Sequence, residues 1–482
     1  MPAQRPKGPF KVTLHMASFG YREAEPDDIE FMAIIKQVET QHTVVIDIDG
    51  PNNQLEIHSP SRDRAVQAIG HIRTATRLEP GGAKVWHPQV LMAPVKVGKA
   101  GFKALMKQNG DEGVRAYMSP NAGPSTTCRA FYELVDKWLE EFREVLFRAA
   151  RQIRVNSSEM RMRVQFGELL LQEWKKNIEE YTYDDLESVI KRLGVRGTFS
   201  FDQMLGKPQL AHNLVQKVYA SPSHFEPSGS RTGALEHIKP THTLILTTKI
   251  LKIETQVINV QESETLRNRL RLGTARGYRR ERRSRAVEIA TSCPEHKYDW
   301  NLVLRTQVPV GSLPFNHDDL NKCARLKPRS DPNEFPDIQL GDFTKNFDVE
   351  MIQGKTAWVF KLQGSPYAIE VAVYHVIAAA GEVPEHMKGG GCGVDLFWPA
   401  WDEVLEAHDD ADGPRDLREN CKELFPYYEK RLEDKDGVEP FVRRIREIHA
   451  LISSMDDKPP ARLAESVAQP AEEEDLLLSW GD

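Results

Sequence analysis

The stretch WVFKLQGSPYAIEVAV, residues 358–373, decides the fold class of this sequence. Large apolar side chains stand at every second position on both sides of its centre: Trp358, Phe360, Leu362, Ile369, Val371 and Val373. A repeat of two residues is typical of a β-strand with one buried face. The same alternation recurs through residues 241–304, so the sequence predicts a mainly antiparallel sheet, strongly curved.

Helical patterns flank this run of strands. Apolar residues from Phe131 to Ala149 share one helical face and predict a core-facing helix. Residues 160–167, MRMRVQFG, alternate like a half-buried strand, whereas residues 95–128 read as a connecting segment with a short helix. We therefore predict an α+β protein whose large domain spans residues 95–452, followed by a disordered acidic tail at residues 453–482.

Residues 10–80 predict a separate, smaller α/β lobe. A helical stripe at residues 31–38 is followed by alternating strands at residues 44–49 and 55–57, with a Gly-Pro-Asn-Asn turn between them. Ser61 is placed to cap a second helix. This order of elements resembles the second half of a KH domain, a small RNA-binding module.

The lobe departs from the KH pattern at the position of its phosphate clamp. A KH domain places a GxxG loop before its second helix, so that backbone amides approach RNA phosphates. Here the corresponding residues 23–28 read EAEPDD, with four acids and no glycine. The resemblance therefore implies a degenerate KH-like lobe in which the usual clamp is absent.

A wider resemblance rests on five segments: MRMRVQFGELLLQEWKK (160–176), EYTYDDLESVIKRLGVRGTFSFD (180–202), HKYDWNLVLRT (296–306), SPYAIEVAVYH (365–375) and WPAWDEVL (398–405). They are similar to an uncharacterised fungal family, in which KH-like modules precede a large C-terminal domain of unknown function. The resemblance implies this architecture and, through the KH label, RNA binding. It supplies no catalytic residues.

Composition favours an intracellular, non-membrane protein. No apolar run approaches the ~18 residues that a membrane-spanning helix needs. Five scattered cysteines without a CxxC spacing argue against a zinc or disulfide framework. The first ten residues hold three prolines and no apolar core, so we expect a cytoplasmic protein, with a mitochondrial location as the alternative.

Charge is unevenly distributed along the chain. From Asp395 onward there are 24 acidic and 11 basic residues, so residues 1–394 hold 47 acidic and 53 basic ones. A mildly basic body is compatible with contact to nucleic acid.

The densest charge feature is the run RGYRRERRSR, residues 276–285, with strands predicted on both sides. On a projecting hairpin its side chains would reach phosphates and bases. The candidates are Arg276, Tyr278, Arg279, Arg280, Arg282, Arg283 and Arg285. Arg161 and Arg163 share one strand face and would extend the same basic groove. The open alternative is a solvated hairpin whose arginines pair with the protein's own acids.

The C-terminal run EEEDLLLSW, residues 472–480, ends an otherwise polar tail with large apolar side chains. Leu476, Leu477, Leu478 and Trp480 are candidates for docking on a protein partner. A frayed end is the alternative.

No pattern predicts catalysis, a cofactor or a metal. The histidines form no HExxH motif, no GxSxG elbow exists, and Cys293 with His296 lacks further marks of a nucleophile and base. Asp47 and Asp49 on one strand face are interpreted as solubilising acids. We predict a non-catalytic RNA-binding protein. The alternative is a protein-interaction scaffold whose KH-like lobe has lost RNA binding.

Overall fold

The computed structural model divides into two compact units, residues 1–87 with 148–154, and residues 88–147 with 155–482. It describes the following residues: 8–15, 29–49, 54–76, 89–109, 113–150, 154–155, 159–172, 174, 178–196, 199–227, 234–261, 268–279, 285–307, 310, 313, 317–340, 348–379, 390–405, 415–416, 424–426 and 437–455.

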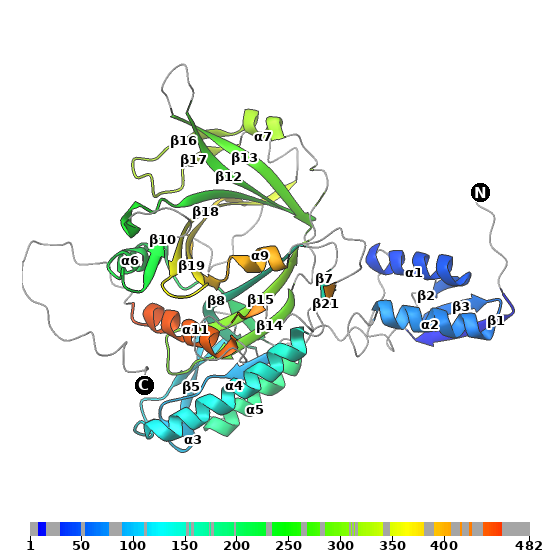
Figure 1. Cartoon of the computed structure of the whole chain (residues 1–482), viewed down its shortest axis with the longest axis horizontal. Coiled ribbons are helices and arrows are strands. Elements are labelled where there is room, and N and C mark those ends of the chain that lie inside the picture. The colour runs from blue at the N-terminus through cyan, green and yellow to red at the C-terminus, as the bar shows by residue number, and fades with distance from the viewer. Residues whose placement is uncertain are drawn as a thin grey trace, which may run out of the picture. The chain divides into compact units, whose positions relative to one another are not determined.

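The small unit is a three-stranded antiparallel sheet with two helices packed on it (Figure 1). Its elements are β1 (Phe10–His15), α1 (Ile29–His42), β2 (Val45–Asp49), β3 (Gln54–Ser59) and α2 (Arg62–Thr76). The strand order is β1-β3-β2. Apolar side chains of both helices and of β2 and β3 form one core, which includes Val38, Ile46, Ile57 and Ile72. The alternate residues of these strands therefore face away from the helices.

The large unit begins with a short strand, a hairpin and a long helix. These are β4 (Gln89–Met92), α3 (Gly98–Gly101), β5 (Ala104–Asn109), β6 (Gly113–Met118) and α4 (Cys128–Ala150). The next elements alternate helix with strand: β7 (Arg154–Val155), β8 (Glu159–Leu171), α5 (Tyr183–Arg196), β9 (Phe199–Asp202), α6 (Pro208–Tyr219), β10 (Phe225–Pro227) and the 3-10 turn η2 (Leu235–His237).

The remainder of the large unit is dominated by strands. They are β11 (Thr241–Thr248), β12 (Leu251–Gln261), β13 (Asn268–Arg279), β14 (Arg285–Ser292), β15 (Asp299–Gln307), β16 (Arg325–Lys327), β17 (Asp337–Gln339), β18 (Val349–Leu362), β19 (Ala368–Ala379), β20 (Gly391–Phe397) and β21 (Arg415–Asp416). The helices among them are α7 (His317–Cys323), α9 (Ala400–Val404) and α11 (Val438–Ser453).

One large sheet organises the unit, in the order β13-β12-β11-β18-β19-β20-β8-β15-β14-β4. Every neighbouring pair is antiparallel except β14 with β4, which is parallel. The predicted α+β class with a mainly antiparallel sheet and flanking helices is confirmed. Among the described residues, no helix is long and apolar enough to cross a membrane.

Helices cover one face of this sheet. On α4, Trp138 and Phe142 pack edge-on against Trp300 of β15, and on α6, Tyr219 packs against Phe360 of β18. On α11, His449 stacks on Phe166 of β8. The alternation at residues 358–373 therefore marks the face that packs against helices. Burying each such aromatic side chain stabilises the fold by about 1.5–3 kcal/mol.

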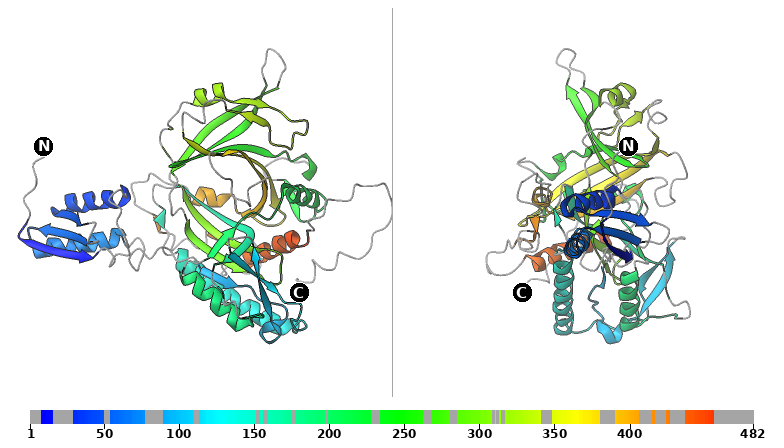
Figure 2. Two further views of the ribbon diagram at one scale, coloured as in Figure 1. Left: turned by 180° about the vertical axis from the view of Figure 1, so that it is seen from behind. Right: turned by 90° about the vertical axis from the view of Figure 1, so that its right-hand side faces the viewer.

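The sheet is strongly curved away from these helices. Arg161 of β8 hydrogen-bonds Tyr278 of β13 at 3.2 Å and approaches Glu254 of β12 at 3.7 Å. In the sheet order, β20, β19, β18 and β11 stand between β8 and β12. The two ends of this run must therefore bend toward each other, and the strands form an arc in Figure 2. We call the side on which Arg161 and Glu254 meet the concave face.

Two predictions about local structure are wrong. Residues 95–128 are more than a connecting segment, because β5 and β6 form a hairpin there and Phe102, Val114 and Ala116 enter a core cluster. The arginine run does not form a hairpin of its own within the described residues. Its flanking strands have other partners, since β13 pairs with β12, and β14 pairs with β15 and β4.

Candidate functional site

Strand alternation places polar side chains on the concave face. On β8, Met162, Val164 and Phe166 are buried toward the helices, so Arg161, Arg163 and Gln165 point the other way. Their register partners on β15 are Arg305, Val303 and Asn301, in that order. The two strands therefore bring three arginines to one face.

The same face continues across the middle of the sheet. Asp395 of β20 pairs with Gln165 on one side and with Glu370 of β19 on the other, while Tyr374 of β19 pairs with Lys355 of β18. We call the charged residues of this face, with the two tyrosines, the concave cluster: Arg161, Arg163, Lys252, Glu254, Tyr278, Arg305, Lys355, Glu370, Tyr374 and Asp395.

Short ion pairs connect members of the cluster. The Lys355 ammonium lies 2.6 Å from a Glu370 oxygen, and the Lys252 ammonium lies 2.7 Å from a Glu254 oxygen. The side chains of Lys355 and Glu370 each keep 22% of their surface exposed. Solvent therefore reaches the pair, although it sits on the inside of the arc.

Burial and neighbouring charge set the protonation of the central residues. Burial raises the pKa of Asp395 to about 6, and the nearby Glu370 carboxylate adds to this. Burial also raises the pKa of the Tyr374 phenol to about 12, which keeps it a hydrogen-bond donor at neutral pH. For Lys355, burial acts to lower the pKa, but Tyr374 and Glu370 outweigh it and the pKa is raised. The lysine therefore stays charged.

Glu254 shows that the two ends of the arc share one electrostatic environment. Burial acts to raise its pKa, yet Lys252, Arg161 and Lys355 outweigh this and lower it. These cations come from β12, β8 and β18. Because cations from three different strands act on its carboxylate, Glu254 lies within the concave cluster and not at its edge.

Arg163 and Arg305 have different partners. Arg163 makes a bidentate pair with Asp402 of α9, at 2.9 and 2.8 Å, and lies over the Phe397 ring. Arg305 donates to the amide oxygens of Gln165 at 3.1 Å and Gln203 at 3.4 Å. A carboxylate pairs with the first arginine, and amide oxygens orient the second, which also acts electrostatically on Asp395.

The structure brings some of the predicted residues together. Arg161 and Tyr278 meet through their hydrogen bond, and the guanidinium carbon lies 5.7 Å from the ring centroid. Arg276 and Arg279 are exposed on β13, at the end of the sheet order. Tyr278 itself is buried, so it is not available to stack on a base as predicted.

Other predicted residues lie beyond what the structure describes. Arg280, Arg282 and Arg283 are outside the described residues, and so are Leu476, Leu477, Leu478 and Trp480. Arg285 begins β14, but its side chain is not described.

The pair Cys293 and His296 is not poised for nucleophilic catalysis. Complete burial raises the pKa of the Cys293 thiol well above its usual range. Burial lowers the pKa of His296 to about 4. At neutral pH both groups are therefore uncharged, and a reactive thiolate does not form.

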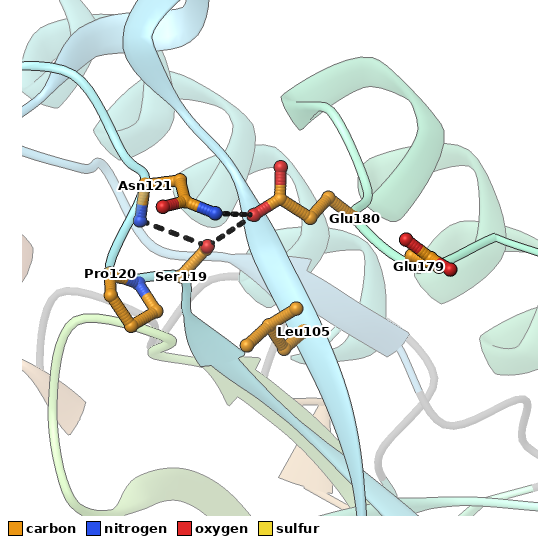
Figure 3. A pocket seen from close by; sticks show the side chains of 6 residues that line it. All are labelled: Leu105, Ser119, Pro120, Asn121, Glu179 and Glu180. Carbon is orange, nitrogen blue, oxygen red and sulfur yellow. Dashed lines mark hydrogen bonds between the residues drawn. The ribbon is translucent and has the colours of Figure 1, made fainter.

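A separate cavity of roughly 590 Å³ lies beside the β5–β6 hairpin (Figure 3). Its polar walls bind one another: the Ser119 hydroxyl and the Asn121 amide both donate to one oxygen of Glu180, at 2.6 and 2.8 Å. The hydrogen bonds from Ser119, Asn121 and Lys103 lower the pKa of Glu180 to about 2. These contacts hold the loop before α5 against the hairpin, a structural role.

The sequence matches a family model described as a domain of unknown function, DUF7905, over residues 128–410. The chain belongs to this family. The DUF7905 region contains all ten members of the concave cluster. Comparison with curated proteins finds no match.

Two solved structures are similar to the chain at low scores. They are the S. pombe Pct1 RNA triphosphatase, and the same protein in complex with the Spt5 CTD. Each has 8% sequence identity to this chain and a TM-score of 0.35. The matched region covers 66% of this chain in both cases, 93% of the first neighbour and 94% of the second. A similarity of this size supports no inference about function. The KH-like and fungal resemblances stay predictions.

Proposed function

We propose that the DUF7905 region binds RNA, and that the concave cluster contacts its phosphate groups. The observation that supports this is the convergence of cationic side chains from four strands: Arg161 and Arg163 from β8, Lys252 from β12, Arg305 from β15 and Lys355 from β18. Charges held on a partly buried face cost stability compared with well-packed apolar residues. A protein that keeps them there is a candidate for binding a charged ligand.

The chemistry of the cluster fits a phosphorylated ligand with hydroxyl groups. Lysine and arginine donate charge-assisted hydrogen bonds to phosphate oxygens. Glu370 and Asp395 would accept from ligand hydroxyls such as the 2′-OH, which distinguishes RNA from DNA. Tyr374 keeps its proton and would donate to the same ligand.

The exposed arginines on β13 would extend this contact. Arg276 is the register partner of Glu254 and is exposed, and Arg279 is exposed at the end of the strand. In this proposal the arginines act as an outer phosphate-binding edge, and the hairpin of the sequence prediction is replaced by the curved sheet. We assign no reaction to the site and propose binding without chemical conversion.

The test measures binding of a fluorescein-labelled single-stranded RNA by anisotropy over a series of salt concentrations. We expect Arg305→Gln to weaken binding about tenfold and to reduce the slope of log Kd against log salt by about 1, since one phosphate contact is lost. Arg276→Gln with Arg279→Gln should lower affinity by a smaller factor.

Arg443→Gln is the matched control, because this arginine lies on α11 in an exposed pair with Glu439, away from the concave face. Thermal unfolding confirms that each variant is folded. Equal Kd and equal salt slope for Arg305→Gln, Arg443→Gln and the unmodified protein would overturn the proposal. The scaffold alternative, which depends on the C-terminal tail, stays a prediction.

A further inference from the structure

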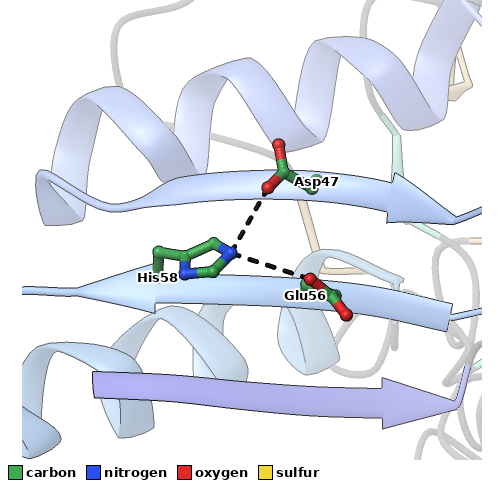
Figure 4. Close-up of side chains that lie close together, drawn as sticks. All are labelled: Asp47, Glu56 and His58. Carbon is green, nitrogen blue, oxygen red and sulfur yellow. Dashed lines mark ion pairs between the residues drawn. The ribbon is translucent and has the colours of Figure 1, made fainter. Parts of the chain in front are cut away.

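Three potential metal ligands meet on the face of the small unit's sheet that points away from its helices. Leu55 and Ile57 of β3 face the helical core, so Glu56 and His58 face the other side of the sheet. On β2, Asp47 is the register partner of Glu56 and lies diagonally across from His58. Figure 4 shows the three side chains converging from the two strands.

His58 is the unusual member of this group. The residue is only 8% exposed, and its Nε2 has no hydrogen-bond partner within the described residues. The nearest acceptors lie too far or at the wrong angle for a good bond: an Asp47 oxygen at 3.3 Å and a Glu56 oxygen at 3.8 Å. Both contacts are ion pairs when the ring is protonated, but neither gives the buried Nε2 a hydrogen bond, and a buried nitrogen without one costs stability. A cation between them would remove that cost.

The spacing fits such a cation. One ligand atom from each residue lies within 4.8 Å of the other two. Bonds of ~2.0–2.2 Å to a tetrahedral ion place neighbouring ligand atoms roughly 3.3–3.6 Å apart. The distance from His58 to Asp47, 3.3 Å, already falls in this range, and that from His58 to Glu56, 3.8 Å, needs a change of a few tenths of an ångström. The Asp47 and Glu56 oxygens, which lie within 4.8 Å of each other, would have to adopt the same separation through side-chain rotation.

We propose that Asp47, Glu56 and His58 form a binding site for a divalent transition-metal ion such as Zn²⁺. An imidazole ligand favours zinc, copper, iron or nickel over calcium and magnesium, which prefer oxygen ligands. Three protein ligands leave a fourth position for water. The ion would join β2 to β3 on the face of the sheet that points away from the helices.

A neighbouring lysine limits the affinity. The Lys11 ammonium of β1 lies 2.7 Å from Oε1 of Glu56, whereas the oxygen that approaches His58 is Oε2. Glu56 can therefore bridge Lys11 and the ion. Because the lysine adds positive charge beside the site, we expect Lys11→Gln to bind the ion more tightly than the unmodified protein.

The test titrates Co²⁺ into the full-length protein and follows the visible absorption of tetrahedral cobalt, with Zn²⁺ as the competitor. We expect one cobalt site that Zn²⁺ displaces. Asp47→Asn should weaken binding at least tenfold, and His58→Gln should abolish the absorption band. Asp63→Asn, an exposed acid at the start of α2, is the control and should leave the Kd unchanged.

Fifteen histidines in the chain could bind cobalt elsewhere, so the variants decide the outcome. The proposal is overturned if Asp47→Asn binds like Asp63→Asn, or if the unmodified protein shows no tetrahedral band. In either case the three side chains form only an ion pair. The Asp47→Asn change is at a side chain 43% exposed, which keeps the test free of a folding defect.

Discussion

Two charged groups of the large unit differ in how completely their partners surround them. Arg115 of β6 and Asp299 of β15 are each 1% exposed and 2.7 Å apart. Asp299 also accepts hydrogen bonds from the backbone amides of Leu169 at 2.9 Å and Cys293 at 2.7 Å. The concave cluster instead keeps its central pair, Lys355 and Glu370, open to solvent.

This difference separates a structural pair from a candidate binding site. The carboxylate of Asp299 is fully used in joining β6, β8 and the end of β14, so no ligand can reach it. In the concave cluster, charges of both signs remain accessible, and an incoming ligand can replace water. A fully buried, fully paired charge such as Asp299 is therefore a poor candidate for ligand binding, whereas an accessible charge such as Lys355 is a better one.

The largest effect should come from breaking the structural pair. Arg115→Met leaves the Asp299 carboxylate buried without its cation, which we expect to lower the free energy of unfolding by about 3–5 kcal/mol. Urea unfolding at 25 °C measures this. Arg129→Ala, at a side chain 91% exposed, should change it by less than ~0.5 kcal/mol. A decrease in the free energy of unfolding of less than ~1 kcal/mol for Arg115→Met would contradict the structural role assigned to the Arg115–Asp299 pair.

A smaller effect concerns pH and the concave cluster. The pKa of Asp395 is raised from 3.8 to about 6, chiefly by burial. Between these pH values the folded protein holds a proton that the unfolded chain has released. Stability from this group is therefore present below pH ~4 and is lost as pH rises through ~6, by about 2–3 kcal/mol in total.

Asp395→Asn removes this titration. The stability of the variant minus that of the unmodified protein should therefore rise between pH 4 and pH 7, as measured by urea unfolding at each pH. A difference that stays flat with pH would mean that Asp395 titrates normally.

The smallest effect on stability should come from removing the accessible pair as a whole. Lys355→Met with Glu370→Met replaces both charges by apolar groups, and we expect the free energy of unfolding to change by about 1 kcal/mol or less. RNA binding should fall at the same time. Loss of stability as large as for Arg115→Met, with binding retained, would reverse the roles assigned to the two groups.

The sequence predicts where strands occur, but not which strands pair with one another in the sheet. The alternation at residues 358–373 correctly predicts which side chains of β18 and β19 are buried. It cannot reveal that β8 lies between β20 and β15, because those partners come more than a hundred residues later in the chain. The β5–β6 hairpin was missed because residues 104–109, ALMKQN, lack a clear alternation.

The same limitation hid most of the candidate sites. Lys355, Glu370 and Asp395 are single charges within apolar strands, and each alone is typical of a solvent-facing strand position. Arg161 and Tyr278 were selected as parts of an arginine-rich groove, yet only the curvature of the sheet explains why they meet. For Asp47, the sequence pointed to Asp49 on the same strand, whereas its partners Glu56 and His58 lie on the neighbouring strand β3.

The position of β8 also governs how the protein emerges from the ribosome. This strand ends at Leu171, but its partner β15 begins at Asp299 and its partner β20 at Gly391. β6 and β9 pair only with residues 168–171 of this strand. At ~5–20 residues per second, residues 159–167 of β8 therefore wait roughly 6–26 s before β15 is even synthesised. An unpaired strand edge of this kind is prone to aggregation, so we expect co-translational folding of the large unit to benefit from a chaperone during that interval.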